Sequence, residues 1–213
     1  MNLLIFGATG HIGQAITAET LRRGHDVTAV VRDLARLSGA WPKLDVIVGD
    51  IAKPNTYSDA LRHADAVIVA VSARRDGEPK ALARNAGIVL DAAARAGVAR
   101  LAWVGGAASL EVKPGVRVID DPNFPAAWRP EAEAQAEALA AFRASKADID
   151  WVYVSPAAVI EDGEHTGNYR VGGDRLLVDA HGKSHISVPD FAAALIDRVE
   201  QNDHPRQRIT VAY

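Results

Sequence analysis

The feature that most constrains the fold of this chain is a series of short apolar runs in which hydrophobic residues occupy consecutive positions. The strand-length runs are residues 3–6, 27–31, 46–48, 66–71, 101–104 and 151–154. Strands with this pattern are covered on both faces, as in parallel sheets flanked by helices. Stretches of helical character separate the runs, so strand and helix alternate along the chain. We therefore predict an α/β fold built on a doubly wound parallel sheet.

Glycine and proline mark the ends of the helical segments between the runs. These segments are residues 11–23, 79–96 and 130–145. The last third of the chain changes character and predicts two short strands, 169–173 and 176–178, joined by a turn. A final helix is predicted to start at Ser187-Val188-Pro189-Asp190, which is similar to a capping box, and a last strand at 209–211.

A chain of 213 residues is expected to form about one domain. We predict a single domain over residues 1–213, in which residues from about 156 to 213 form a small C-terminal substrate-binding appendage. This appendage is too short to be a separate enclosing domain, so a shallow, open site is expected.

Composition excludes several classes of function. The net charge is −3 with both signs interspersed, so neither a nucleic acid nor an anionic membrane is an expected partner. The absence of cysteine rules out disulfides, thiolate metal sites, iron–sulfur clusters and a cysteine nucleophile. The seven histidines have no metal-ligand spacing, so no metal is expected. The chain also has neither a membrane-length apolar run nor a signal peptide at its start, which predicts a cytoplasmic protein.

The first apolar run leads directly into Gly7-Ala8-Thr9-Gly10-His11-Ile12-Gly13, and a helical segment follows at once. Glycines at this spacing allow a tight turn, a close approach of the backbone to a pyrophosphate, and close packing of helix on strand. The phosphates then meet free amides at the positive end of the helix dipole. The alternative is a glycine-rich turn without a ligand. We predict a Rossmann-type dinucleotide site whose candidate residues here are Gly7, Thr9, Gly10, His11, Ile12 and Gly13.

The ends of the next two runs concern the choice of cofactor. Arg32 ends the second run, where an arginine can bind the 2′-phosphate of NADP(H) bidentately. The adjacent Asp33 leaves NAD(H) possible, and Arg32 itself could be a solvated strand end. Asp50, followed by Ile51, ends the third run and could accept from the adenine amino group or cap the next loop. NADP(H) is therefore favoured, with NAD(H) as the alternative.

These motifs occur in an order that resembles the atypical short-chain dehydrogenase/reductase superfamily. Within it the chain is similar to the NAD(P)H-flavin reductase and biliverdin reductase B branch, with NmrA-like proteins nearby. The resemblance covers residues 3 to about 200, and it implies NAD(P) binding on a Rossmann-type fold. The segments that carry it are the glycine loop, Val30-Val31-Arg32-Asp33, Val48-Gly49-Asp50, Val104-Gly105-Gly106-Ala107-Ala108-Ser109-Leu110, Ser155-Pro156-Ala157 and Thr166-Gly167-Asn168-Tyr169-Arg170.

The sequence departs from this superfamily at the catalytic residues. Carbonyl-reducing members use Tyr-x-x-x-Lys, in which the tyrosine protonates the developing alkoxide. The four tyrosines here, Tyr57, Tyr153, Tyr169 and Tyr213, have no lysine four positions later. The biliverdin reductase branch also has a histidine shortly after its Pro-Pro, whereas here Ala157 follows Pro156. Reduction of carbonyls or of linear tetrapyrroles is therefore not the expected activity.

Flavin reduction remains chemically suited to such a site, because the flavin ring accepts hydride and spreads the charge without a positioned acid. The nicotinamide is expected beside the residues Ala70, Val71, Ser72 and Gly105, under a loop of Ser155, Pro156 and Ala157. Ser109 is a candidate catalytic donor, and Ala107 and Trp128 are expected on the substrate side, with Trp128 stacking on the acceptor. The alternatives are turn or cap roles for Ser72 and Ser109 and simple packing for Trp128. Arg74 and Arg75 could attract an anion or lie in a solvated loop.

We accordingly expect an NAD(P)H-dependent reductase that takes FMN, another flavin or a quinone-like molecule as a small-molecule acceptor. One alternative is an NmrA-like redox-sensing regulator that binds NADP without turnover. Another is a reductase or isomerase of a small natural product. A monomer or a homodimer would serve any of these functions.

Overall fold

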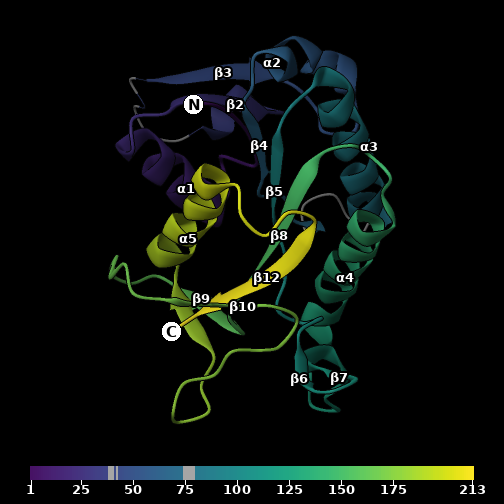
Figure 1. The fold of residues 1–213 in the computed structure, drawn as a ribbon, viewed down its shortest axis with the longest axis vertical. Coiled ribbons are helices and arrows are strands. Elements are labelled where there is room, and N and C mark those ends of the chain that lie inside the picture. The colour runs from purple at the N-terminus through teal and green to yellow at the C-terminus, as the bar shows by residue number, and fades with distance from the viewer. Residues whose placement is uncertain (38–40, 42, 74–79) are drawn as a thin grey trace.

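The computed structural model describes residues 1–37, 41, 43–73 and 80–213. Within them, eight strands form one sheet in the order β10-β12-β8-β5-β4-β1-β2-β3 (Figure 1). The strands that run parallel are β1 (Asn2–Phe6), β2 (Asp26–Val31), β3 (Leu44–Val48), β4 (Ala66–Val69), β5 (Arg100–Val104), β8 (Asp150–Pro156) and β12 (Gln207–Ala212). The strand order reverses its direction between β1 and β4, and open α/β sheets bind their ligands at such a point.

Helices cover both faces of this sheet, as predicted for a doubly wound fold (Figure 1). On one face α1 (His11–Arg22) packs on α5 (Val188–Gln201). On the other face lie α2 (Ser58–Arg62), α3 (Lys80–Ala96) and α4 (Arg129–Ala144). Along β1, Leu3 and Ile5 enter the core beneath α1 and α5, whereas Leu4 and Phe6 enter the other core. Consecutive positions are apolar because neighbouring side chains on a strand point to opposite, equally buried faces.

Short helical turns complete the connections between these elements. They are η1 (Leu34–Arg36), η2 (Pro54–Thr56), η4 (Val118–Asp120) and η5 (Ala126–Trp128). Gly24 follows α1 with φ of +83°, a left-handed conformation that glycine adopts without strain. At the start of α5, the Ser187 hydroxyl accepts from the amide of Asp190 at 3.2 Å, which is the predicted N-cap.

The C-terminal third differs most from the sequence prediction. The first predicted short strand is present as β10 (Arg170–Gly172), which pairs antiparallel with β12 at the sheet edge. The predicted second strand, 176–178, is wrong, because this segment pairs with another part of the chain. The Leu176 amide donates to the Glu111 carbonyl at 2.9 Å, and the Glu111 amide donates to the Asp174 carbonyl at 2.9 Å. The backbone groups of Asp174 and Leu176 therefore form hydrogen bonds with Glu111 and not with β10, so the predicted hairpin does not form.

Two further strand pairs and one early strand end were not predicted. The pairs are β9 (Val159–Glu161) with β11 (His185–Ser187), and β6 (Glu111–Lys113) with β7 (Val116–Arg117). Each of these strands has at most three residues, too few to give a readable apolar pattern. β4 ends at Val69, so Ala70 and Val71 belong to the loop after it. The predicted helix start at Pro79, and the residues Arg74 and Arg75, lie outside the described part of the chain.

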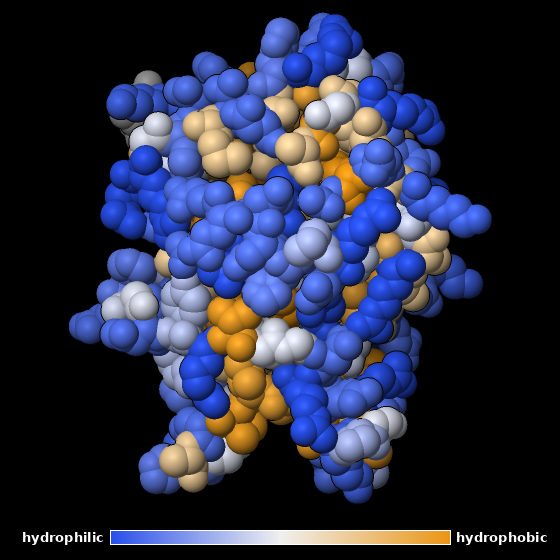
Figure 2. Space-filling view, in the orientation of Figure 1, coloured by the Kyte–Doolittle hydropathy of each residue, from blue (hydrophilic) through white to orange (hydrophobic). Residues whose placement is uncertain are grey.

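The face of the molecule in Figure 2 is mainly hydrophilic, with apolar side chains gathered below its centre, where β9 and β10 lie in Figure 1. Each of these strands carries an exposed valine, Val159 on β9 and Val171 on β10. Among the described helices, none combines the length and the apolar character that crossing a membrane requires.

Candidate functional site at the carboxyl edge of the sheet

A cavity of about 540 Å³ lies at the carboxyl edge of the sheet, where the strand order reverses. Its walls come from the segments that follow β1, β2, β3, β4, β5 and β8, together with α3, α4 and α5. Most of the predicted cofactor residues line it. They are Gly7, Thr9, Gly10, His11, Ile12, Gly13, Arg32, Asp50, Ile51, Ala70, Val71, Ser72, Gly105 and Pro156.

The glycine loop between β1 and α1 has no room for side chains at two of its glycines. Gly7 has φ of +84°, and a Cβ there would lie 2.1 Å from the Ala70 carbonyl oxygen. A Cβ on Gly13 would lie 2.0 Å from the Gly7 carbonyl oxygen. The Gly10 amide donates to that same oxygen at 2.9 Å and closes the turn. The predicted reasons for these glycines, a tight turn and close packing of helix on strand, are therefore visible in the geometry.

The N-terminus of α1 opens into this cavity. Gly10 is its N-cap and supplies no side-chain hydrogen bond, so the first-turn amides are not capped by that residue. Free amides at the positive end of a helix dipole make a site for phosphate groups. The exposed His11 ring lies within 2.9 Å of Asp162 (Nε2 to Oδ1), so the segment after β9 reaches the glycine loop. Phosphates bound here would lie between α1 and the C-terminal third of the chain.

Two arginines stand where β2 ends. Arg32 and Arg36 both line the cavity, although only Arg32 was predicted. The Asp33 carboxylate accepts from the Ala35 amide at 3.0 Å and caps η1, which places Arg36 one turn after Arg32. The spacing Arg-x-x-x-Arg could have predicted Arg36 as a second cavity residue, because a capped helical turn brings residues at this spacing to the same side of the turn. This end of the cavity suits an additional phosphate.

Of the two roles predicted for Asp50, the structure shows the loop cap, and the bond to the adenine amino group stays a prediction. Asp50 Oδ1 accepts from the Ala52 amide at 3.0 Å, so it caps the loop after β3, and Asp50 also lines the cavity. The Tyr57 hydroxyl donates to the Ile51 carbonyl at 2.9 Å and steadies the same loop. Burial, and secondarily the charge of Asp50, raise the pKa of Tyr57 to about 12, so this donor keeps its proton at physiological pH.

A hydrogen-bonded group that was not predicted lies at the opposite end, beside the carboxyl ends of β4 and β5. Glu131 and Gln135 of α4 line the cavity together with Ser72. The Ser72 hydroxyl donates to Glu131 Oε2 at 2.9 Å, and Gln135 Nε2 donates to Glu131 Oε1 at 3.2 Å. Gln135 Oε1 in turn accepts from the Tyr153 hydroxyl at 2.9 Å, which orients the amide. The sequence feature that could have indicated this contact is a glutamate and a glutamine four residues apart on a predicted helix, since such residues are neighbours on the helix surface.

Tyr153 also explains why a side chain at position 105 has no room in this protein, because its ring lies against Gly105. A Cβ on Gly105 would lie 1.9 Å from Tyr153 Cε1. The ring is fully buried, and burial raises the pKa of Tyr153 well above its usual value. Tyr153 is therefore a neutral donor that supports Gln135, and it does not itself line the cavity.

Five of the predicted residues do not line this cavity, and their roles stay predictions. Ser155 and Ala157 are buried in and just after β8, and the Ser155 hydroxyl has no hydrogen-bond partner among the described residues. Ser109 Oγ accepts from Arg208 Nη1 at 3.4 Å, which holds it beside β12. Trp128 is 55% exposed on η5, so it neither lines the cavity nor covers the sheet as a buried side chain. Ala107 likewise lies outside the lining.

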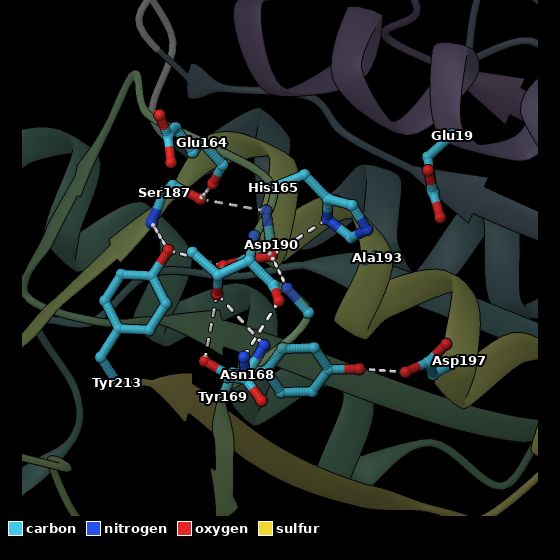
Figure 3. A network of polar contacts seen from close by, with 12 residues as sticks. Glu19, Glu164, His165, Asn168, Tyr169, Ser187, Asp190, Ala193, Asp197 and Tyr213 are labelled. Atoms are coloured by element: carbon cyan, nitrogen blue, oxygen red, sulfur yellow. Dashed lines mark hydrogen bonds and ion pairs between the residues drawn. The ribbon is translucent and has the colours of Figure 1, made fainter.

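A buried carboxylate of α5, that of Asp190, joins this helix to the loop at 165–167 and to Tyr213 (Figure 3). Asp190 has a fully buried side chain, and its Oδ2 accepts from the hydroxyls of Thr166 and Tyr213, each at 2.6 Å. His165 Nδ1 lies 3.0 Å from Asp190 Oδ1. Burial acts to raise the pKa of Asp190, but the hydrogen bonds from Thr166 and Tyr213 outweigh it and lower the pKa. The loop at 165–167 and the last residue are thereby fixed near Val188, which lines the cavity.

Together these residues fit a dinucleotide. The glycine loop and the N-terminus of α1 offer amides for a diphosphate, the arginines offer charge for a further phosphate, and apolar groups form walls for the rings. Among the described residues, no group of three or more histidine, aspartate or glutamate side chains is placed to hold a metal ion.

Comparison with known proteins agrees with this assignment. A model of a family described as NAD(P)H-binding matches residues 7–202. The uncharacterised protein YwnB of Bacillus subtilis is 35% identical over 99% of this chain and 98% of its own length. The 3-diazoavenalumate denitrifying reductase of a Streptomyces species is 30% identical over 95% of this chain and 69% of its own length. A Streptococcus pneumoniae crystal structure, provisionally named an NADH-flavin reductase, is 33% identical, covers 100% of this chain and 99% of its own, and superposes with a TM-score of 0.89.

Proposed function

Because this chain belongs to the NAD(P)H-binding family of atypical short-chain dehydrogenase/reductase type, we propose that it is a reductase of flavins or quinone-like acceptors. The observation that carries the proposal is the cavity at the carboxyl edge, which joins a glycine cradle to a second, hydrogen-bonded end. The Streptococcus pneumoniae protein supports the choice of flavin by its provisional name.

NADP(H) is the cofactor that the lining residues favour. Gly7, Gly10 and Gly13 would hold the diphosphate, and Arg32 with Arg36 would hold the 2′-phosphate. Asp33 is engaged in capping η1, so it offers less to the ribose hydroxyls that NAD(H) presents at this position.

The acceptor class follows from what the chain's own residues can do. When bound, NAD(P)H would supply the hydride. Reduction of a ketone gains about 10²–10⁴-fold from a positioned proton donor, and this sequence has no Tyr-x-x-x-Lys pair to provide one. A flavin or quinone can accept the hydride without such an acid, so the protein's part is to position the two rings and exclude water.

The test is oxidation of NADPH by the purified protein, followed with and without added FMN, riboflavin or menadione. We expect turnover that depends on the acceptor, together with NADPH binding measured separately by calorimetry. Failure to bind either NADPH or NADH at millimolar concentration would overturn the proposal. Binding without turnover of any flavin or quinone would instead support an NmrA-like sensor.

A second candidate is reduction of a small natural product, and it is favoured by the similarity to the Streptomyces reductase. That relative extends well beyond the length of this chain, which covers 69% of it. The two candidates differ in the acceptor: a flavin reductase oxidises NADPH with riboflavin, whereas a natural-product reductase would do so only with an aromatic substrate such as a diazo compound.

A further inference from the structure

The carboxylate of Glu131 is held in place in the wall of the cavity. Its Oε2 accepts from the Ser72 hydroxyl at 2.9 Å, and its Oε1 accepts from Gln135 Nε2 at 3.2 Å. The Gln135 amide is itself fixed, because its Oε1 accepts from the Tyr153 hydroxyl at 2.9 Å and from Trp103 Nε1 at 3.4 Å. Glu131 also lies in the first turn of α4, where the helix dipole favours a negative group. The protein therefore holds a carboxylate in one orientation at this place.

This carboxylate lies at the end of the cavity away from the arginines. Arg32 and Arg36 follow β2, the glycine loop follows β1, and Ser72 follows β4, and these three strands are neighbours in that order in the sheet. A dinucleotide with its extra phosphate at the arginines and its diphosphate at the glycine loop therefore has its nicotinamide half beside β4 and β5. Hydride transfer requires the reacting atoms to be in contact, so the ring of the acceptor belongs at this end too.

Glu131 gives this end of the cavity a charge opposite to that of the arginine end. Among the described residues that line the cavity, those that follow β4, β5 and β8 or belong to α3, α4 and α5 are uncharged, apart from Glu131. Glu131 is half-buried, so its charge is screened less than a charge on an open surface. A ring that carries its own negative charge is repelled at such a place, whereas an uncharged ring is not.

We propose that Glu131 selects the acceptor by charge: the site takes flavins and quinones whose ring system is uncharged, and it rejects those that carry a sulfonate or a carboxylate on the ring. The inference rests on the proposed function and deepens it, because it names the class of acceptor that the same site takes. The selection concerns the ring, so a phosphate at the end of a flexible chain, as in FMN, is affected less.

The experiment compares two naphthoquinones, menadione and 1,4-naphthoquinone-2-sulfonate, of which only the second carries a negative charge on the ring. NADPH oxidation gives kcat/KM for each quinone in the wild type, in Glu131→Gln and in Glu131→Asp. The ratio between the two quinones is then compared across the variants, which cancels their different intrinsic reactivities. We expect Glu131→Gln to shift this ratio about tenfold toward the sulfonate, mainly through a lower KM, because a like charge has been removed. Glu131→Asp keeps the charge and should keep most of the wild-type ratio.

Glu133→Gln is the matched control, because it removes the same charge from the same helix. Glu133 is exposed, its Oε1 lies 3.9 Å from Arg129 Nη1, and it is not among the residues that line the cavity. This variant should leave the ratio unchanged, which separates a charge in the cavity wall from the net charge of the molecule. A ratio in Glu131→Gln equal to that of the wild type would overturn the inference, and so would an equal shift in Glu133→Gln.

A binding measurement tests the inference without turnover. Calorimetry gives the affinity of each quinone for the complex with NADP⁺, which has no hydride to donate, in the wild type and in Glu131→Gln, with thermal midpoints showing that both are folded. We expect Glu131→Gln to bind the sulfonate about tenfold more tightly and menadione unchanged. This result without turnover of any flavin or quinone would contradict the proposed function and support the inference. Turnover without this result would contradict the inference alone, and failure of the wild type to bind either quinone would overturn both.

Discussion

At the scale of single residues, Gly13 offers the sharpest test of the cofactor site. Gly13→Ala would bring a methyl group to 2.0 Å from the Gly7 carbonyl oxygen, and backbone cannot move aside as a flexible side chain could. We expect this variant to lose NADPH binding by at least tenfold and to unfold at a lower temperature, measured by calorimetry and thermal melting.

Gly87→Ala is the matched control for that substitution. Gly87 lies within α3, and a Cβ there would meet no atom of the described residues within 4 Å outside the helix's own backbone. Alanine in an open helical position should raise stability by about 0.5–1 kcal/mol and leave NADPH affinity unchanged. Equal losses in both variants would mean that the glycine loop has no special role.

Arg32 provides a second prediction at this scale, which concerns the choice between cofactors. Arg32→Ala should weaken NADPH by about tenfold or more, because a charge-assisted bond to phosphate contributes roughly 1.5–3 kcal/mol. NADH lacks the 2′-phosphate, so its affinity should change little. Calorimetric titration with both cofactors checks this, and Arg36→Ala tests whether the second arginine shares the role. If Arg32→Ala weakened NADPH and NADH equally, Arg32 would have no specific role in binding the 2′-phosphate.

Site residues could be predicted from the sequence where a short local motif identifies them, and could not be predicted where their position depends on how a helix packs. Gly7, Gly10 and Gly13 are defined by spacing within one turn between strand and helix, so the sequence was sufficient. Asn85 and Glu131 belong to helices whose side toward the cavity is set only by packing on the sheet. Nothing in the immediate sequence distinguishes Asn85 from the other polar residues of α3, and for Glu131 the local signal is limited to Gln135 one turn later.

At the scale of elements, a charged group joins α1 to α5 and includes Glu19, which Figure 3 also draws. The Glu19 carboxylate accepts from Arg22 and Arg23, each at 2.7 Å, and Arg23 continues to Asp197 of α5 at 2.7 Å. The hydrogen bond from Arg22 first, and then Arg23, lower the pKa of Glu19 to about 2 against the opposing effect of burial. This group fixes how α1, whose N-terminus faces the cavity, lies against α5.

The lowered pKa predicts how Glu19→Gln changes stability with pH. A carboxyl whose folded pKa lies below its unfolded value of 4.5 stabilises the protein above that pH, and the contribution is lost as pH falls toward 2. Glu19→Gln should therefore lower the free energy of unfolding by about 1–3 kcal/mol at pH 7, with the gap from the wild type narrowing between pH 5 and pH 3. Urea denaturation across this range measures it. Glu137→Gln, at an exposed position of α4, is the control, and a gap that stayed constant with pH would contradict the prediction.

The elements themselves could be predicted where burial on both faces left a long apolar run. β1, β2 and β5 were found within about two residues, because helices cover both sides of the sheet there. The pair β9 and β11 could not be found, since each has three residues and its partner is distant in sequence. The strand predicted at 176–178 after β10 was wrong for a similar reason. Leu176 pairs with Glu111, which lies 65 residues earlier, and no local sequence pattern predicts such a contact.

At the scale of the whole molecule, the last third of the chain is built into the sheet and the cavity. β12 pairs with β8 inside the sheet, and α5 packs on α1. Pro156, Ile160 and Val188 line the same cavity as the glycine loop. We predict from this that residues 156–213, which the sequence predicts as a substrate-binding appendage, do not unfold as an independent unit.

Calorimetric unfolding in the presence of NADPH tests that prediction. A ligand at 100 times its Kd stabilises the native state by about 2.7 kcal/mol, which for a chain of this size raises Tm by roughly 5–10 °C. If the cavity belongs to one cooperative unit, a single transition should move by this amount, and Arg32→Ala at the same NADPH concentration should show about half the shift, since tenfold weaker binding leaves about 1.4 kcal/mol. Two transitions, of which NADPH moved only one, would instead mean that the C-terminal third is a separate domain that contributes to the cavity by docking, because only the unit that binds the ligand gains its stabilisation.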